Sequence, residues 1–302
     1  MKKYILGAIL GATLISMQSY AKVYQIGATQ IVEHSVLDSV RVGFEKGLKD
    51  SGIDYKIDYE NAQGDMLTQQ LIGKGFASKK KDLVLAISTP SVQAVANSTE
   101  NIPILFGAVS DPSATGVSDR KNVTGVADAI PTGKLVEETL KLFPNTKKVG
   151  IIYNTSEKNS ESNIARIQEN LKGTGVEVVT SGVTALNDIP ASLEVLLKKV
   201  DILYMLPDNM VVSASTLIFK RAKDTKKPVL ALGYNQEQIS TGALLSVSVD
   251  YEKLGYRLGE MASDILTGKK EIKDLPFEVP NTYPVLINKD MEKFYNLTID
   301  AK

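Results

Sequence analysis

Residues Lys81-Asp-Leu-Val-Leu-Ala-Ile87 and Val200-Asp-Ile-Leu-Tyr204 resemble one another. In both stretches an aspartate precedes a short apolar run in which no polar residue alternates. Such runs are typical of parallel strands that are buried on both faces. The two aspartates, Asp82 and Asp201, are 119 positions apart. The pair predicts a chain built from two copies of one α/β plan.

The neighbouring signals repeat in the same order. Glycine turns lie at Gly52 and Gly175, 123 positions apart, and strand prolines lie at Pro103 and Pro228, 125 positions apart. Strands and helices alternate, which forces parallel sheets with right-handed crossovers. We therefore expect two doubly wound parallel-sheet lobes, with the Ser-, Asp- and Gly-rich segment 107–125 as the passage between them.

Helix signals fit this plan. Ser35 is a candidate N-cap, and Asp65 is positioned to cap a second helix. Two predicted amphipathic helices carry glycines with G-x-x-x-G spacing, at Gly43 and Gly47 and again at 255 and 259. We interpret these pairs as sites of close packing between helices.

The N-terminus has the three parts of a secretory signal peptide, which predicts cleavage after Ala21. Lys2 and Lys3 precede an apolar run over 4–15, and small residues occupy Ser19 and Ala21. A membrane anchor is the alternative, but a spanning helix needs about 20 apolar residues. Because the chain has no cysteine, a lipid-modified form is not expected, and we predict a soluble periplasmic protein.

Composition excludes several classes of function. Without the predicted signal peptide, 33 basic residues face 35 acidic ones, whereas a nucleic-acid-binding surface calls for a basic patch. The absence of cysteine excludes disulfides and thiolate metal sites, and a single histidine excludes a two-histidine metal site. There is no P-loop, G-x-G-x-x-G or G-x-S-x-G motif. We expect no metal, no cofactor and no catalysis.

Polar residues follow the predicted strands at the edge where parallel α/β sheets bind ligands. The candidates for a ligand site in a cleft between the lobes are Thr29, Gln30, His34, Thr89, Ser91, Ser110, Asp111, Asn154, Asp208, Asn209, Tyr234 and Asp250. The alternative for each is that it caps a helix.

Several stretches together resemble one known family. They are residues 27–34, 58–65, 88–94, 106–112, 122–126, 207–209 and 249–251. The chain resembles the substrate-binding proteins of ABC transporters, in the family that includes tryptophan- and tyrosine-binding members. This resemblance implies the type I periplasmic-binding-protein fold with a three-crossing hinge. We expect an N-terminal lobe of 22–125 plus about 250–280, and a C-terminal lobe of 126–249 plus about 281–302.

The resemblance also implies a small-molecule ligand, an amino acid that is often aromatic, and an ABC transporter permease as partner of a monomer. Thr89 and Ser91 suit a carboxylate, because they open a helix. Asp208, or else Asp250, suits an ammonium group. Tyr234 is the candidate aromatic partner, with Gln30 and His34 near the rim.

Two other functions are also compatible with the sequence. One is a ligand sensor that signals to a membrane receptor, since its closing lobes would have the same sequence pattern. The other is a hydrolase or isomerase that uses His34 and a carboxylate of the cleft.

Overall fold

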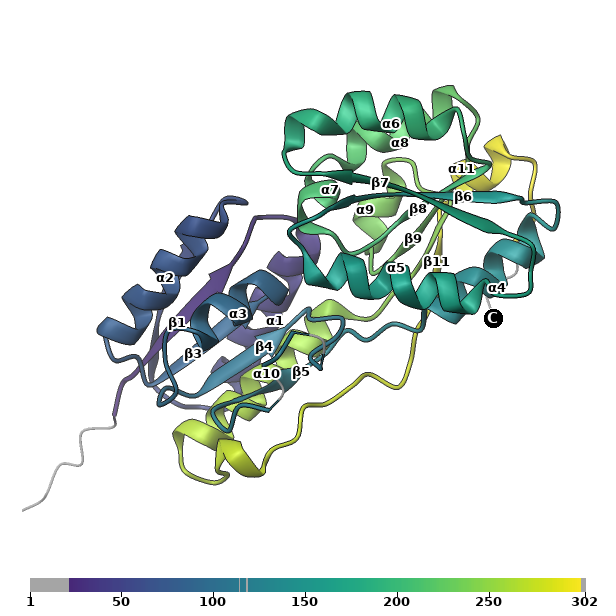
Figure 1. Ribbon diagram of the computed structural model, residues 1–302. Coiled ribbons are helices and arrows are strands. Elements are labelled where there is room, and N and C mark those ends of the chain that lie inside the picture. Colours follow the sequence, from purple (N-terminus) through teal and green to yellow (C-terminus); the bar gives the residue numbers. More distant parts are fainter. Residues whose placement is uncertain (1–21, 114, 118, 300–302) are drawn as a thin grey trace, which may run out of the picture.

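The computed structural model describes residues 22–113, 115–117 and 119–299, and the predicted signal peptide over 1–21 lies outside them. The described chain forms two α/β lobes, each around its own sheet (Figure 1). The two-lobed architecture predicted from the alternating pattern is therefore confirmed. No helix in the described residues combines the length and apolar character needed to cross a bilayer.

The first lobe has a parallel sheet in the order β2-β1-β3-β4-β5. Its strands are β1 (Tyr24–Gln30), β2 (Tyr55–Asn61), β3 (Leu83–Ile87), β4 (Ile104–Gly107) and β5 (Val123–Val126). Its helices are α1 (Ser35–Asp50), α2 (Met66–Ser78), α3 (Thr89–Ala96) and the later α10 (Tyr251–Leu266). All five residues of β3 are buried, as its apolar run predicted. Asp65 caps α2 by accepting the Thr68 N–H over 2.6 Å.

The second lobe has a sheet in the order β11-β10-β9-β8-β6-β7, in which only β11 runs antiparallel to its neighbour. Its strands are β6 (Lys148–Asn154), β7 (Glu177–Val183), β8 (Ile202–Met205), β9 (Val229–Leu232), β10 (Leu245–Val247) and β11 (Val285–Ile287). Its helices are α4 (Thr132–Leu142), α5 (Lys158–Asn170), α6 (Ile189–Leu197), α7 (Asn209–Ser213), α8 (Ser215–Asp224), α9 (Gln236–Ser240) and α11 (Lys289–Phe294). A short 3₁₀ turn, η1 (Leu186–Asp188), lies in this lobe, and a second one, η2 (Ile272–Asp274), contacts β5 of the first lobe.

The passage out of the first lobe starts later than the sequence suggested. Val123–Val126 is not a linker but β5, the edge strand that pairs with β4, so the expectation that 107–125 joins the lobes needs this correction. Beyond β5, the Ala127 N–H donates to the carbonyl of Glu278 over 2.8 Å. The Glu278 N–H donates to Gly125 over 2.9 Å. Two of the connecting segments therefore run side by side.

Helices α1 and α10 pack closely enough to need their glycines. A Cβ atom added at Gly43 would overlap the backbone of Glu252, and one added at Gly255 would overlap the backbone of Val40. A Cβ atom added at Gly47 or at Gly259 would likewise overlap the backbone of the facing helix. The close packing predicted from the G-x-x-x-G spacing is confirmed, and it holds α10 on the first lobe.

Candidate functional site

A cavity with an empty volume of about 370 Å³ lies between the lobes. The first lobe and the passage beside it contribute His34, Val36, Leu37, Thr89, Ala108, Ser110, Asp128 and Tyr251. The second lobe contributes Asn159, Pro207, Asn209, Val212, Gly233 and Gln238. Five of these residues, Thr89, Ala108, Asp128, Pro207 and Gly233, lie one or two positions beyond a strand, so the cavity lies at the carboxyl edges of both sheets.

Four side chains that line this cavity have buried polar atoms with no hydrogen-bond partner among the described residues. These atoms are both ring nitrogens of His34, Oγ1 of Thr89, Oδ1 of Asp128 and Oδ1 of Asn159. In folded proteins the large majority of buried polar side-chain atoms are paired. Four exceptions around one cavity indicate groups that a ligand would complete.

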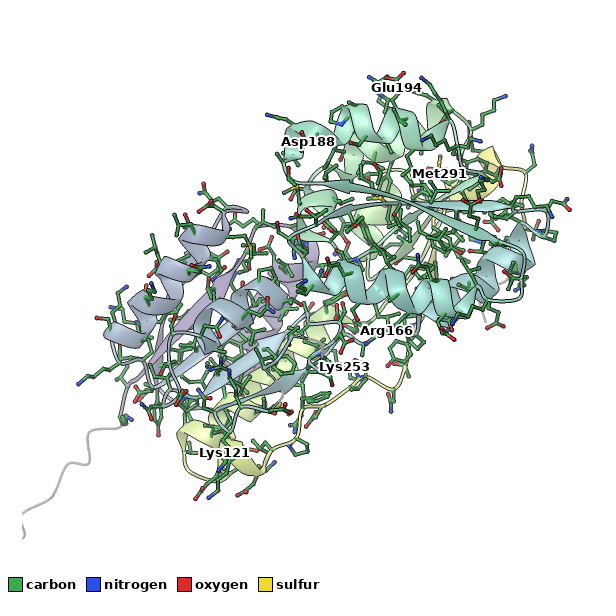
Figure 2. All side chains as sticks on the ribbon, in the orientation of Figure 1. Lys121, Arg166, Asp188, Glu194, Lys253 and Met291 are labelled. Atoms are coloured by element: carbon green, nitrogen blue, oxygen red, sulfur yellow. The ribbon has the colours of Figure 1, made fainter. Side chains whose placement is uncertain are left out.

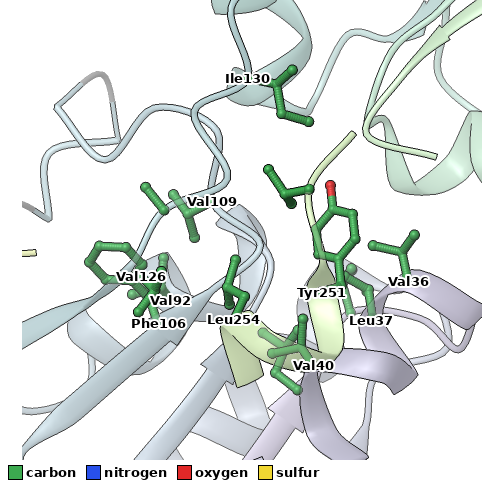
Figure 3. Close-up of a cluster of buried hydrophobic side chains, with 14 of the residues drawn as sticks. Val36, Leu37, Val40, Val92, Phe106, Val109, Val126, Ile130, Tyr251 and Leu254 are labelled. Carbon is green, nitrogen blue, oxygen red and sulfur yellow. The ribbon is translucent and has the colours of Figure 1, made fainter. Parts of the chain in front are cut away.

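Asp128 is the one carboxylate among the described residues that line this cavity. It is only 2% exposed, and its Oδ2 accepts the hydroxyl of Tyr251 over 2.9 Å. Figure 3 shows Tyr251 with its hydroxyl directed away from Leu254 and Val40, among the apolar residues of α1 and α10. Burial raises the pKa of Asp128, and the bond from Tyr251 opposes this rise. A cationic group at Oδ1 would remove the cost of burying the charge.

The start of α3 forms the wall of the cavity on the first lobe. Thr89 is the first residue of α3 and is 2% exposed. Ser88 and Ala108 each directly follow a strand and have left-handed φ angles of 91° and 52°. Non-glycine residues rarely adopt this strained conformation, which is concentrated at binding sites. The free N–H groups of the first turn of α3 favour an anion here.

A buried chain of hydrogen bonds holds this start of α3 in place. The Gln69 side-chain amide donates to Thr29 over 3.1 Å and accepts the Ser91 hydroxyl over 3.0 Å. The hydroxyls of Ser88 and Ser91 are 3.1 Å apart. Thr29 and Ser91, which the sequence placed in the site, therefore lie behind the cavity wall and position it.

His34 lies at the other side of the first-lobe wall, just before α1. Burial lowers its pKa to about 4, and the nearby side chain of Asn209 opposes this only in part. The ring is therefore neutral at neutral pH. Neither nitrogen has a carboxylate partner in the described residues, so the pairing that a histidine-based hydrolase needs is not formed.

Two asparagines of the second lobe face the cavity, and Glu157 fixes both. Its Oε2 accepts the side-chain amides of Asn159 over 3.1 Å and of Asn209 over 2.6 Å. Asn159 also donates to the carbonyl of Pro207 over 2.7 Å. Burial and the neighbouring Asp208 raise the pKa of Glu157 to about 7. With the Asn159 amide nitrogen occupied, its oxygen is presented to the cavity as an acceptor.

Asp208 and Asp250, the two carboxylates expected to bind an ammonium, are used as helix caps instead. Asp208 caps α7 through the Val211 N–H, and its other oxygen accepts the Asn154 N–H over 2.7 Å and the Ser160 hydroxyl over 2.6 Å. Asp250 is exposed and caps α10. Neither lines the cavity.

Three further predicted residues lie outside the cavity lining. Tyr234 is fully buried in the core of the second lobe, where its ring packs near Phe219. Gln30 is fully buried and donates to Val32 and Asp38 over 3.0 and 2.9 Å. Asn154 lines a neighbouring hollow between the lobes. Of the predicted set, the residues brought together around the cavity are His34, Thr89, Ser110 and Asn209.

Asp111 makes a contact between the lobes. It lies in the first lobe after β4, and it accepts the hydroxyl of Ser162 on α5 over 2.6 Å. It also forms an ion pair with Arg166 of α5, which Figure 2 places on the side of that helix toward the first lobe. The Arg166 guanidinium donates to the carbonyl of Ser110 over 3.5 Å as well. These bonds connect the two lobes.

Sequence reasoning missed Asp128, Asn159, Gln238 and Tyr251. Asp128 lies two residues beyond β5, and the rule of examining strand ends would have found it had β5 been recognised. Asn159 and Tyr251 lie in the first turns of α5 and α10. No cluster of three or more metal-ligating His, Cys, Asp or Glu side chains occurs in the described residues.

Comparisons with known proteins agree with this geometry. A protein of Clostridioides difficile (strain R20291) named Tyrosine-binding protein is 40% identical over 277 residues, which cover 89% of this chain and 79% of that protein. The crystal structure of an ABC domain in complex with L-Trp, from Streptococcus pneumoniae, has a TM-score of 0.87 at 30% identity. The match covers 92% of this chain and 96% of that one. The type I periplasmic-binding-protein fold is thereby confirmed.

The lobe arrangement resembles that of the liganded structure. The ligand-free, open structure of a substrate-binding protein with adhesive properties from Clostridium difficile is 39% identical, with the same coverage of 92% and 96%. Its TM-score is only 0.69, below that of the less similar L-Trp complex. The lower score at higher identity indicates that the lobes here are closed.

The sequence match extends to the family level. The family described as ABC transporter substrate binding protein matches residues 25–302, which includes both lobes and all three connections between them. On this match, the chain belongs to the family of ABC transporter substrate-binding proteins.

Proposed function

We propose that the cavity between the lobes binds an amino acid for delivery to an ABC transporter permease. The observation that carries this proposal is the set of unpartnered polar atoms around one cavity, which includes a carboxylate oxygen. The α-ammonium group pairs with Asp128 and donates to the Asn159 oxygen. The α-carboxylate meets Thr89 and the start of α3, where the helix dipole favours negative charge.

We propose further that the side chain of the ligand is aromatic. Apolar groups of both lobes line the cavity, among them Val36, Leu37 and Val212, and the ring of Tyr251 lies beside them. The names of the relatives support this choice, since one is called a tyrosine-binding protein and another was solved with L-Trp. Neutral His34 supplies hydrogen-bonding nitrogens for a polar ring substituent such as a phenol.

Contacts from both lobes are made only in the closed form, so binding shifts the population toward closure. We place this activity in the periplasm, after removal of residues 1–21. The closed form would then be the one that the permease accepts.

A thermal-shift screen of the mature protein tests the ligand class. A ligand that binds only the folded state stabilises it by RT ln(1 + [L]/Kd), so the melting temperature rises with the logarithm of the ligand concentration once that exceeds Kd. We expect L-tyrosine, L-tryptophan or L-phenylalanine to give a shift that titration calorimetry confirms, and their N-acetyl derivatives to give none. A clear shift with a sugar, alongside silence for all common amino acids, would overturn the proposal.

A further inference from the structure

A second hollow between the lobes adjoins the ligand cavity. Its empty volume is about 740 Å³, and we refer to it as the second chamber. It is lined by Ile31, Val32, Gln63, Gly64, Met66, Asn154, Glu157, Leu186, Asn209, Met210 and Ser213. The first five belong to the first lobe and the others to the second, so closure of the cleft forms this chamber too.

Asn209 lines both the ligand cavity and the second chamber. Its backbone N–H and its side-chain amide both donate to Oε2 of Glu157, over 3.1 and 2.6 Å. Its carbonyl accepts the hydroxyl of Ser213 over 2.9 Å. With only 7% of the residue exposed, this side chain is held in one position. It therefore forms a fixed wall that the two spaces share.

The lining of the second chamber defines what could enter it. No lysine or arginine is among its described lining residues, and most of its larger side chains are apolar. Both oxygens of Glu157 already accept hydrogen bonds, Oε1 from the Met210 N–H over 3.2 Å and Oε2 from the side-chain amides of Asn159 and Asn209. An uncharged, elongated group fits this lining, because apolar side chains can pack against it and no cationic side chain is there to pair with an anion.

We propose that Asn209, held by Glu157, is the wall that limits ligand size, and that removing this side chain opens the second chamber to the far end of a longer amino acid side chain. This inference rests on the proposed amino acid function of the ligand cavity. The ammonium and carboxylate of the ligand keep their partners on Asp128 and at the start of α3. When the Asn209 side chain is removed, only the length of ligand side chain that the site accepts changes.

Titration calorimetry with a series of side-chain lengths tests the wall. The probes are L-tyrosine, O-methyl-L-tyrosine and O-benzyl-L-tyrosine, which share one zwitterionic end. For the parent protein we expect affinity to fall along the series. For Asn209→Ala we expect tyrosine to weaken while O-benzyl-L-tyrosine gains about tenfold relative to tyrosine, a change of about 1.4 kcal/mol in relative binding free energy.

A second variant tests whether the gain in affinity for O-benzyl-L-tyrosine comes from the second chamber. Met66 lines the chamber from α2, is 37% exposed and does not line the ligand cavity. Adding Met66→Trp to Asn209→Ala should cancel the gain for the benzyl ether, whereas Met66→Trp alone should leave tyrosine binding as it is. Circular dichroism melts confirm that each variant is folded.

The outcomes separate the two proposals. If the parent protein binds no amino acid, the proposed function fails. If the parent binds tyrosine but Asn209→Ala discriminates against the benzyl ether as strongly as the parent does, the wall is refuted. A gain that survives Met66→Trp also refutes the assignment of the second chamber.

Discussion

Arg166 of the second lobe forms an ion pair with Asp111 of the first, and Ser162 donates to the same carboxylate over 2.6 Å. On another face of the cleft, the Asn235 amide donates to Ser35 over 3.1 Å. Contacts of this kind exist only while the lobes are together. These contacts do not touch the ligand, but they stabilise the closed form. They therefore raise the apparent affinity by increasing the fraction of protein that is closed.

Breaking this contact should weaken binding without changing the ligand cavity. The Arg166 side chain is 39% exposed, so we expect Arg166→Ala to raise Kd only about twofold to fivefold. Small-angle scattering of the ligand-free protein should show a more open average shape. Lys198→Ala, which removes an exposed pair with Glu194 at the C-terminal end of α6, is the matched control and should change neither quantity. Additive effects of Asp111→Asn and Arg166→Ala on Kd would mean that the two residues are not coupled.

Asp128 should be the carboxylate on which amino acid binding depends. Asp128→Asn keeps the shape of the side chain but leaves a buried ammonium unpaired, which costs about 3 kcal/mol or more. That corresponds to at least a hundredfold rise in Kd, measured by titration calorimetry. Asp250→Asn is the control, because it alters an exposed cap that does not line the cavity. Equal losses in the two variants would remove Asp128 from its proposed role.

The free energy of unfolding should fall in acid because of His34. Its pKa is about 4 in the folded protein, below the ordinary value of 6.5. As the pH falls, this histidine is therefore protonated in the unfolded chain before it is protonated in the folded one. Stability from this group is full above pH 6.5 and is lost as the pH falls toward 4, by at most about 3 kcal/mol. Denaturant unfolding across this range should therefore show a steeper loss for the parent than for His34→Gln.

This comparison isolates one group, because the chain has a single histidine. The protein must carry no histidine tag. Glu157, whose pKa is raised to about 7, contributes with the opposite sign, since its penalty disappears as it is protonated. That contribution is common to parent and variant and cancels in the difference. Parallel pH profiles for the two proteins would mean that His34 titrates normally.

The sheets were predictable from sequence wherever a strand is a continuous apolar run, as at Leu83–Ile87. The prediction missed β5, because Val123–Val126 is short and contains Thr and Gly among its four residues. Missing this strand displaced the expected passage between lobes. It also hid Asp128, which follows the strand by two positions.

Local pattern could not separate a capping aspartate from a ligand-binding one. Asp208 and Asp128 both follow a strand, but Asp208 is occupied by Asn154 and Ser160, which lie 54 and 48 positions away in the chain. Asp128 meets Tyr251 from 123 positions away, and that bond leaves its second oxygen unpartnered among the described residues. Only the tertiary contacts decide which carboxylate is free for a ligand.

The contact between α1 and α10 allows a matched test of packing within a single type of substitution. Gly255→Ala would drive a methyl group into the backbone of Val40, so the helices must separate. Overpacking of this kind typically costs about 1–3 kcal/mol. Gly75→Ala is the control, since it lies inside α2 with no heavy atom within 4 Å of the added Cβ. Helix propensity alone favours alanine there by about 1 kcal/mol.

Denaturant unfolding should therefore show a lower free energy of unfolding for Gly255→Ala and a higher one for Gly75→Ala. If Gly255→Ala stabilised the protein, the two helices could not approach each other this closely. The position of α10, whose first residue Tyr251 donates to Asp128, would then need another explanation.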